Sequence, residues 1–127
     1  MATAAVNKNL IGSIIFEGYL LKKSKYLRSA RKRWIVLTKN CLYSFKEKNE
    51  YQCPTEVIDL NIYDQSNSDY DSAKDVFELE IFATKTKAKR WFIAESYEEG
   101  KKWQKVIKRT QDVLHKRIYK CDSCGYI

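Results

Sequence analysis

Basic side chains are concentrated between residues 17 and 48, where ten Lys or Arg stand against two acidic residues. The densest run covers residues 22–34 and has Tyr26 and Leu27 at its middle. Cations around an apolar tip can bind a surface that has an anionic exterior and an apolar interior, such as a lipid membrane. We therefore predict that Tyr26 and Leu27 insert between lipids; the alternative is that they fold back on the protein itself.

The same cations could bind a phosphate group. Arg31 and Arg33 are two residues apart on a predicted strand, so their side chains point the same way. Guanidinium groups match phosphate geometry bidentately, and a hairpin would bring Lys22 or Lys23 alongside. A basic strand edge that discourages aggregation is the alternative. The basic headgroup-binding residues predicted in this region are Lys22, Lys23, Lys25, Arg28, Arg31 and Arg33.

The elements that must position these residues are short strands followed by one helix. Aromatic and β-branched runs, separated by turn residues, predict strands over residues 16–23, 31–38, 41–46, 56–60, 76–82 and 90–94. The Asp-, Ser- and Asn-rich segment 64–75 is predicted to be an acidic loop with room for a short strand. A capping box at Ser96 and Glu99 begins a helix over about 97–114 with apolar residues at helical spacing.

This order predicts a mainly β fold, a seven-stranded antiparallel barrel or sandwich capped by one C-terminal α-helix. At 127 residues the chain fits one domain, which we place at 14–118 between tails 1–13 and 119–127. No apolar run approaches the ~18 residues of a spanning helix.

Charge is segregated along the chain. Residues 17–48 and 81–120 each carry an excess of eight positive charges, whereas residues 49–80 carry an excess of eight negative ones. This pattern predicts a polarised body that orients on an anionic partner. The nine acidic residues of the central block disfavour nucleic acid as that partner.

Metal binding and catalysis find little support. Cys121 and Cys124 have the spacing of half a zinc site, but His115 is the only histidine, and zinc normally needs four ligands. Four cysteines are too few for a secreted disulfide scaffold, which favours the cytoplasm. There is no Gly-rich phosphate loop and no nucleophile elbow. We expect no metal, no cofactor and no enzymatic activity.

Three of the predicted strands carry the segments EGYLLK (17–22), RKRWIVLT (31–38) and NCLYSF (40–45), and the predicted helix contains Trp103. These segments resemble the first three strands of the pleckstrin-homology (PH) domain family, which places a tryptophan at the Trp103 position of its helix. The resemblance implies the seven-stranded barrel, with Lys22, Arg31 and Arg33 at the positions of a headgroup-binding motif. It also brings Lys85 and Lys87 to the same open end.

The resemblance further bears on the ligand. Ser44 stands where inositide-selective members commonly have Tyr, and Thr55 where they often have Arg, which leaves room for a smaller headgroup such as phosphatidic acid. Tyr43 is predicted to donate to a phosphate, with ordinary sheet packing as the alternative. In layout alone the chain is also similar to the short acylated PH-domain proteins of apicomplexan parasites.

The prediction for function is reversible, monomeric docking on the cytosolic face of a membrane through phosphatidic acid or a phosphoinositide. The alternative is a protein-interaction module on the same fold, in which the acidic segment 64–75 or a sheet edge binds a peptide.

Overall fold

Seven antiparallel strands and one long helix make up the body of the protein in a computed structural model. The structure describes residues 12–23, 29–117, 120–121 and 125–126. The strands of the main sheet are β1 (Phe16–Lys23), β2 (Ala30–Leu37), β3 (Cys41–Phe45), β4 (Glu56–Asp59), β5 (Gln65–Asp71), β6 (Val76–Phe82) and β7 (Lys89–Ala94). The helix is α2 (Tyr97–Leu114), and a separate two-stranded sheet follows it, made of β8 (Lys120–Cys121) and β9 (Gly125–Tyr126).

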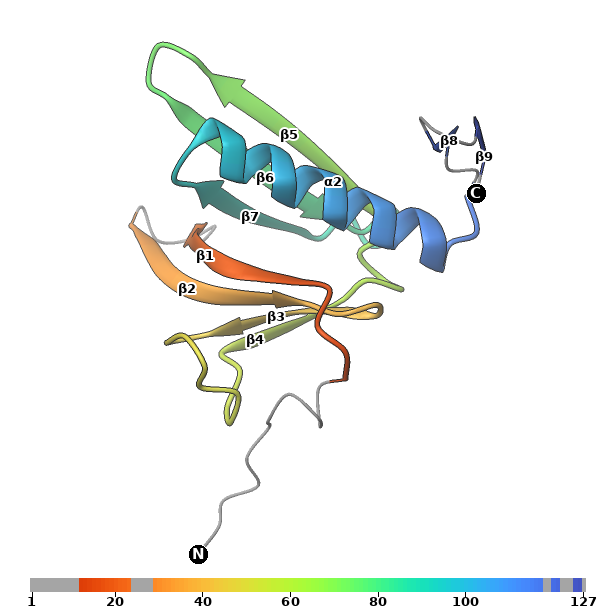
Figure 1. The fold of residues 1–127 in the computed structure, drawn as a ribbon, viewed down its shortest axis with the longest axis horizontal. Coiled ribbons are helices and arrows are strands. Elements are labelled where there is room, and N and C mark those ends of the chain that lie inside the picture. Colours follow the sequence, from red (N-terminus) through yellow and green to blue (C-terminus); the bar gives the residue numbers. More distant parts are fainter. Residues whose placement is uncertain (1–11, 24–28, 118–119, 122–124, 127) are drawn as a thin grey trace, which may run out of the picture.

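The main sheet has the order β4-β3-β2-β1-β7-β6-β5, and every neighbouring pair is antiparallel. Helix α2 packs on the half of the sheet formed by β5, β6 and β7. Figure 1 shows this helix lying across those strands, with β1–β4 forming the other half below it. The predicted fold, a seven-stranded antiparallel sheet closed by one C-terminal helix, is confirmed.

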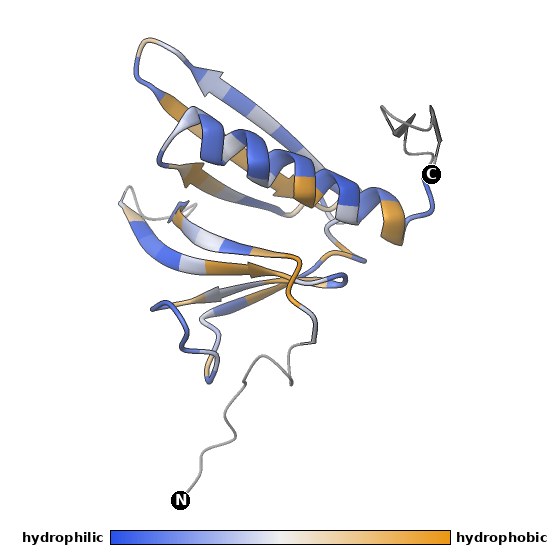
Figure 2. Cartoon of the chain, in the orientation of Figure 1, coloured by the Kyte–Doolittle hydropathy of each residue, from blue (hydrophilic) through white to orange (hydrophobic). Residues whose placement is uncertain are grey.

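The main core lies between the sheet and α2. Alternate residues of the strands point into it, and Figure 2 shows the apolar residues of α2 along one side of the helix. Trp103 of α2 is fully buried, and its ring meets Phe16 edge-on with centroids 4.7 Å apart. Aromatic pairs of this geometry add about 1 kcal/mol beyond burial. Trp103 therefore joins the helix to strand β1.

A second cluster covers the opposite side of β2 and β3. Trp34, Val36 and Phe45 are buried there together with Tyr51 from the β3–β4 connection. Glu17 accepts hydrogen bonds from the Trp34 indole (3.0 Å) and the Tyr51 hydroxyl (2.7 Å). Burial raises the pKa of Tyr51 to about 12, together with its hydrogen bond to Glu17. This cluster fixes the β3–β4 connection against the sheet.

The prediction for residues 64–75 was incomplete, because most of this segment is strand β5. Every residue of β5 pairs with β6, from Gln65 opposite Phe82 to Asp71 opposite Val76. Asp, Ser and Asn have low intrinsic preference for strands, but strand pairing depends more on the neighbouring strand than on composition. Here that neighbouring strand is β6, whose apolar and polar residues alternate regularly.

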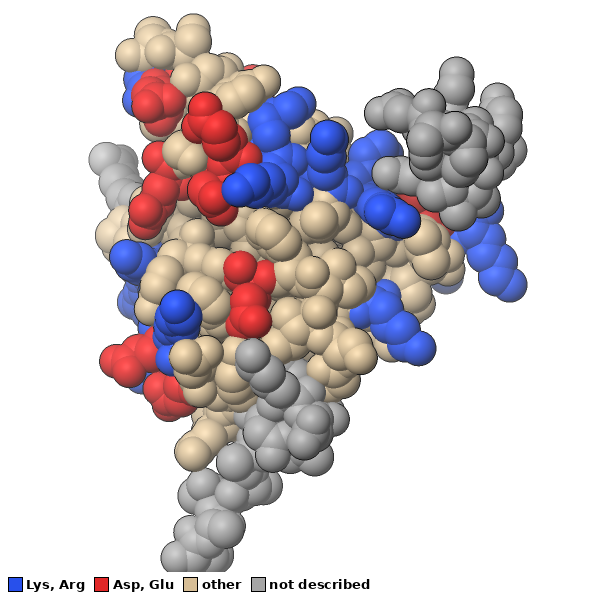
Figure 3. Space-filling view, in the orientation of Figure 1, with Lys and Arg blue, Asp and Glu red and all other residues tan. Residues whose placement is uncertain are grey.

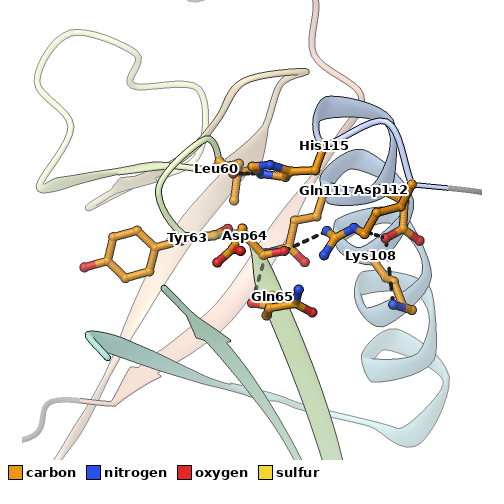
Figure 4. A network of polar contacts seen from close by, with 9 residues as sticks. Leu60, Tyr63, Asp64, Gln65, Lys108, Gln111, Asp112 and His115 are labelled. Carbon is orange, nitrogen blue, oxygen red and sulfur yellow. Dashed lines mark hydrogen bonds and ion pairs between the residues drawn. The ribbon is translucent and has the colours of Figure 1, made fainter. Parts of the chain in front are cut away.

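Helix α2 is fixed at both ends. The Ser96 side chain accepts a hydrogen bond from the Glu99 backbone N–H, as the capping box predicts. Near the other end, Gln111 Nε2 donates to the carbonyl oxygens of Tyr63 (2.7 Å) and Gln65 (3.0 Å), and Arg117 reaches the carbonyl oxygen of Asp64. Figure 4 shows the Gln111 side chain reaching from α2 to the β4–β5 connection. Among the described residues, no helix combines the length and apolar character needed to cross a bilayer.

Candidate anion-binding site

Three basic side chains lie close together at the end of β1 and the start of β2. Lys22 is the register partner of Arg31, and Arg33 is the partner of Leu20. Directly opposed residues of an antiparallel pair project from the same face. Leu20 is fully buried in the core, so the three cations continue the inner, core-facing side of the hairpin.

The carboxylate of Glu56 lies on the same inner face and contacts one of these cations, Lys22. Glu56 is on β4, yet it forms an ion pair with Lys22 on β1 and accepts a hydrogen bond from Arg90 Nε on β7 at 2.7 Å. Its side chain is only 20% exposed. Because β4 is an edge of the sheet and β7 lies beyond β1, these contacts join strands that are far apart in the order of the sheet.

The local electrostatics keep Glu56 charged. Burial on its own would raise the pKa of Glu56, but the hydrogen bonds and charges of Lys22 and Arg90 outweigh burial and hold that pKa below its ordinary value. The hydrogen bond from Arg90 to Glu56 in turn raises the pKa of Arg90. At neutral pH this part of the site is therefore a carboxylate held between two cations.

Ser44 lies beside this arrangement. It is the register partner of both Ile35 on β2 and Glu56 on β4, and it is 1% exposed. Its hydroxyl has no hydrogen-bond partner among the described residues. Buried hydroxyls are normally paired, so the inner face keeps one unused polar group next to Glu56.

Arg31 and Arg33 differ from Lys22 and Arg90. Arg31 is exposed, and Arg33 Nη1 donates to the carbonyl oxygen of Lys32 at 3.2 Å. In the part of the chain that the structure describes, neither guanidinium forms an ion pair with a carboxylate. These two groups can therefore meet an external anion without first releasing an internal one.

Lysines on the outer face of the same strands are paired with glutamates. Lys23 contacts Glu78 at 3.3 Å, and Lys89 lies 3.9 Å from Glu80. Lys32 Nζ lies 3.9 Å from Glu95 Oε1 and 4.5 Å from the centre of the Tyr19 ring. The lysine side chain of each pair is exposed, so each pair contributes at most about 1 kcal/mol and exchanges readily.

The remaining predicted site residues are placed differently. Lys85 and Lys87 are exposed in the β6–β7 turn. Lys23, the last residue of β1, pairs with Trp91 near the start of β7. The β6–β7 turn therefore lies at the same end of β1 as Lys23. Tyr43 pairs with Val36 and packs on the second cluster, so it lies on the face opposite Arg31. The structure does not bring Tyr43 together with the inner cations. Lys25, Tyr26, Leu27 and Arg28 lie outside the described residues.

Glu56 and Arg90 were missed from the sequence, although strand periodicity contained a signal. Ile58 shares a face with Glu56, and Phe92 shares a face with Arg90, and both apolar residues belong to the main core. Counting back by two from them places Glu56 and Arg90 on the inner face.

A metal site is not evident in the described part of the chain, where no group of three or more His, Cys, Asp or Glu could hold an ion. The Cys121–Cys124 pair is not tested by this, because Cys124 lies outside the described residues.

Exposed charge beyond the site is also segregated. Figure 3 shows acidic side chains gathered over the β5–β6 hairpin and the start of α2, and basic ones along the rest of the helix. The exposed basic residues of α2 are Lys101, Lys102, Lys105, Lys108 and Arg109.

Comparisons with known proteins agree with this architecture. A PH domain-containing protein of Dictyostelium discoideum is 32% identical over 99 residues, which cover 76% of this chain and 20% of the relative. The chain therefore spans about a fifth of the length of that relative. The Slm1-PH domain in complex with phosphoserine is 26% identical, with a TM-score of 0.66 over 78% of this chain and 96% of that one. A pleckstrin homology domain solved in solution is also 26% identical, with a TM-score of 0.64 over 83% of this chain and 91% of that one.

The model of the PH domain matches residues 14–112, which is most of the chain and includes the whole sheet and nearly all of α2. With the strand order and the helix position described above, this match shows that the chain belongs to the PH domain family.

Proposed function

We propose that this domain binds phosphorylated lipid headgroups and docks reversibly on the cytosolic face of a membrane. The observation that carries the proposal is the pair Arg31 and Arg33, which lies at the inner rim of the barrel without a carboxylate partner among the described residues. PH domains are generally non-catalytic binding modules, and the similar Slm1-PH domain was solved with phosphoserine, a phosphomonoester. Two guanidinium groups suit such a group because each can donate two hydrogen bonds to phosphate oxygens.

Further basic residues are proposed to strengthen docking without selecting the headgroup. Lys23, Lys25, Arg28, Lys85 and Lys87 would face the anionic leaflet, where each cation contributes about 1 kcal/mol. Tyr26 and Leu27 would enter the lipid, and burial of one Leu contributes about 2 kcal/mol. Phosphatidic acid, which carries a single phosphate group, is the favoured headgroup. Ser44 is buried and Tyr43 faces away from the arginines, so neither side chain adds a ligand for a further phosphate.

Vesicle sedimentation tests the site. The variant Arg31→Ala/Arg33→Ala should lose at least about tenfold in affinity for vesicles containing phosphatidic acid, which corresponds to about 1.4 kcal/mol. The matched control is Lys101→Ala/Lys105→Ala, which removes the same charge from the exposed face of α2. Equal losses in the two variants would mean that net charge, and not a site, drives binding. Unchanged binding in the arginine variant would refute the site.

The finer claims need their own measurements. Leu27→Ser should weaken binding if the loop enters the lipid, and equal affinity would remove that step. A panel of phosphatidic acid, phosphatidylserine and phosphoinositides at matched total charge tests the headgroup. Equal binding across the panel would refute headgroup selection.

A further inference from the structure

Among the described residues, the inner face of the site holds four cations and one carboxylate. Lys22, Arg31, Arg33 and Arg90 share this face, and Glu56 contacts Lys22 and Arg90. Building on the proposed function, we propose that Glu56 competes with the ligand, so that the site accepts one phosphate group at Arg31 and Arg33 and disfavours a second. Glu56 would then be a specificity-determining residue of the headgroup site.

Glu56 is more enclosed than Glu78 on the outer face and contacts more cations. Its two oxygens meet cations from two different strands, and its side chain is 20% exposed. By contrast, Lys23 is the one cation partner of Glu78 in the part of the chain that the structure describes, and the Glu78 and Lys23 side chains are 35% and 45% exposed. Exposed pairs exchange readily with solvent ions, whereas a partly buried carboxylate loses much more when its partners are removed.

A second phosphate group would therefore meet a cost. To bind Lys22 or Arg90, it must separate them from Glu56 and leave that carboxylate partly buried beside another anion. Like charges in contact repel, and a charged group left without partners also loses its hydrogen bonds. A single phosphate between Arg31 and Arg33 avoids both costs, because neither guanidinium forms an ion pair with a described carboxylate.

The substitution Glu56→Gln tests this directly. It removes the negative charge and keeps nearly the same shape, which releases Lys22 and Arg90 for the ligand. We expect vesicles carrying a phosphatidylinositol bisphosphate to bind at least about tenfold more tightly, and vesicles carrying phosphatidic acid at the same total charge to gain much less. The control Glu78→Gln removes one charge from the outer face and should raise both affinities equally and only slightly.

A second readout uses the unaltered protein, in case Glu56→Gln does not fold. Titration with soluble inositol bisphosphate should shift the side-chain nitrogen resonances of Arg31 and Arg33 and leave the carboxyl carbon resonance of Glu56 nearly unmoved, because Glu56 keeps Lys22 and Arg90. A Glu56 resonance that moves as much as those of Lys22 and Arg90 at saturation would overturn the inference, as would equal gains in Glu56→Gln and Glu78→Gln.

The inference and the proposed function can fail separately. Loss of binding in Arg31→Ala/Arg33→Ala, combined with no selective gain in Glu56→Gln, would keep the headgroup site and refute the role of Glu56. If the arginine variant binds normally, the headgroup site itself is refuted, and a gain in Glu56→Gln could not rescue it.

Discussion

At the scale of single residues, Gly100 shows how packing can reverse an intrinsic preference. A Cβ atom at this position in the first turns of α2 would overlap the ring of Phe77 on β6. In an open helix, Gly→Ala normally stabilises by about 1 kcal/mol. Here we expect Gly100→Ala to destabilise the domain by about 2 kcal/mol, because overpacking a filled core forces side chains or backbone to move. Urea unfolding measures the difference.

The neighbouring position provides the control for Gly100. Lys101 is exposed on the same turn, so Lys101→Ala should change stability by less than about 0.5 kcal/mol. A Gly100→Ala variant that is more stable than the wild type would show that the helix can move away from Phe77, contrary to the close approach described above.

The site was partly predictable at this scale. The common face of Arg31 and Arg33 follows from the period of two along one strand, and the proximity of Lys22 follows from one hairpin; both are local relations. The contacts of Glu56 are not local, because they require strand β4 to meet β1 and β7 across the barrel. Strand alternation also explains the placement of Tyr43, which shares the outer face with Phe45 of the second cluster.

At the scale of elements, one buried side-chain amide helps to hold α2 against the β4–β5 connection. Gln111 is 1% exposed, and its Nε2 serves two carbonyl oxygens of the β4–β5 connection (Figure 4). Gln111→Leu would leave both carbonyls without this donor, and a buried polar group without a partner costs about 1–3 kcal/mol. We expect a loss of about 2 kcal/mol in chemical denaturation. Gln104→Leu, at a half-buried helix position, should cost much less; equal losses would contradict a specific role for the amide.

Most elements could be read from the sequence because their apolar periods are regular. Strand β6 alternates strictly and α2 has a capping residue and a helical stripe, so both were predicted within a residue or two. Strand β5 could not be read in this way, since Asn67, Asp69 and Asp71 hide the pattern. Its strand conformation comes from pairing along the whole of β6, which is a tertiary effect.

At the scale of the whole molecule, Glu56 ties an edge strand of the sheet to its other half, so one carboxylate helps to hold the barrel closed. Its pKa is lowered in the folded protein, because the hydrogen bonds and charges of Lys22 and Arg90 outweigh burial. A lowered folded pKa adds stability above the unfolded value of about 4.3, and this stability is lost as the pH falls through the folded pKa. The domain should therefore become less stable on acidification, with this carboxylate contributing about 1 kcal/mol.

Urea unfolding of the wild type and Glu56→Gln at about pH 7 and about pH 3 isolates this contribution. At about pH 7 the variant should be less stable than the wild type. The difference should shrink on acidification, because the wild-type carboxyl takes up its proton as the pH falls through its lowered pKa. The variant should thus gain affinity for a bisphosphate headgroup while it loses stability. A variant that gains affinity at no cost in stability would mean that the contacts of Glu56 with Lys22 and Arg90 serve only to regulate the site and do not hold the barrel together.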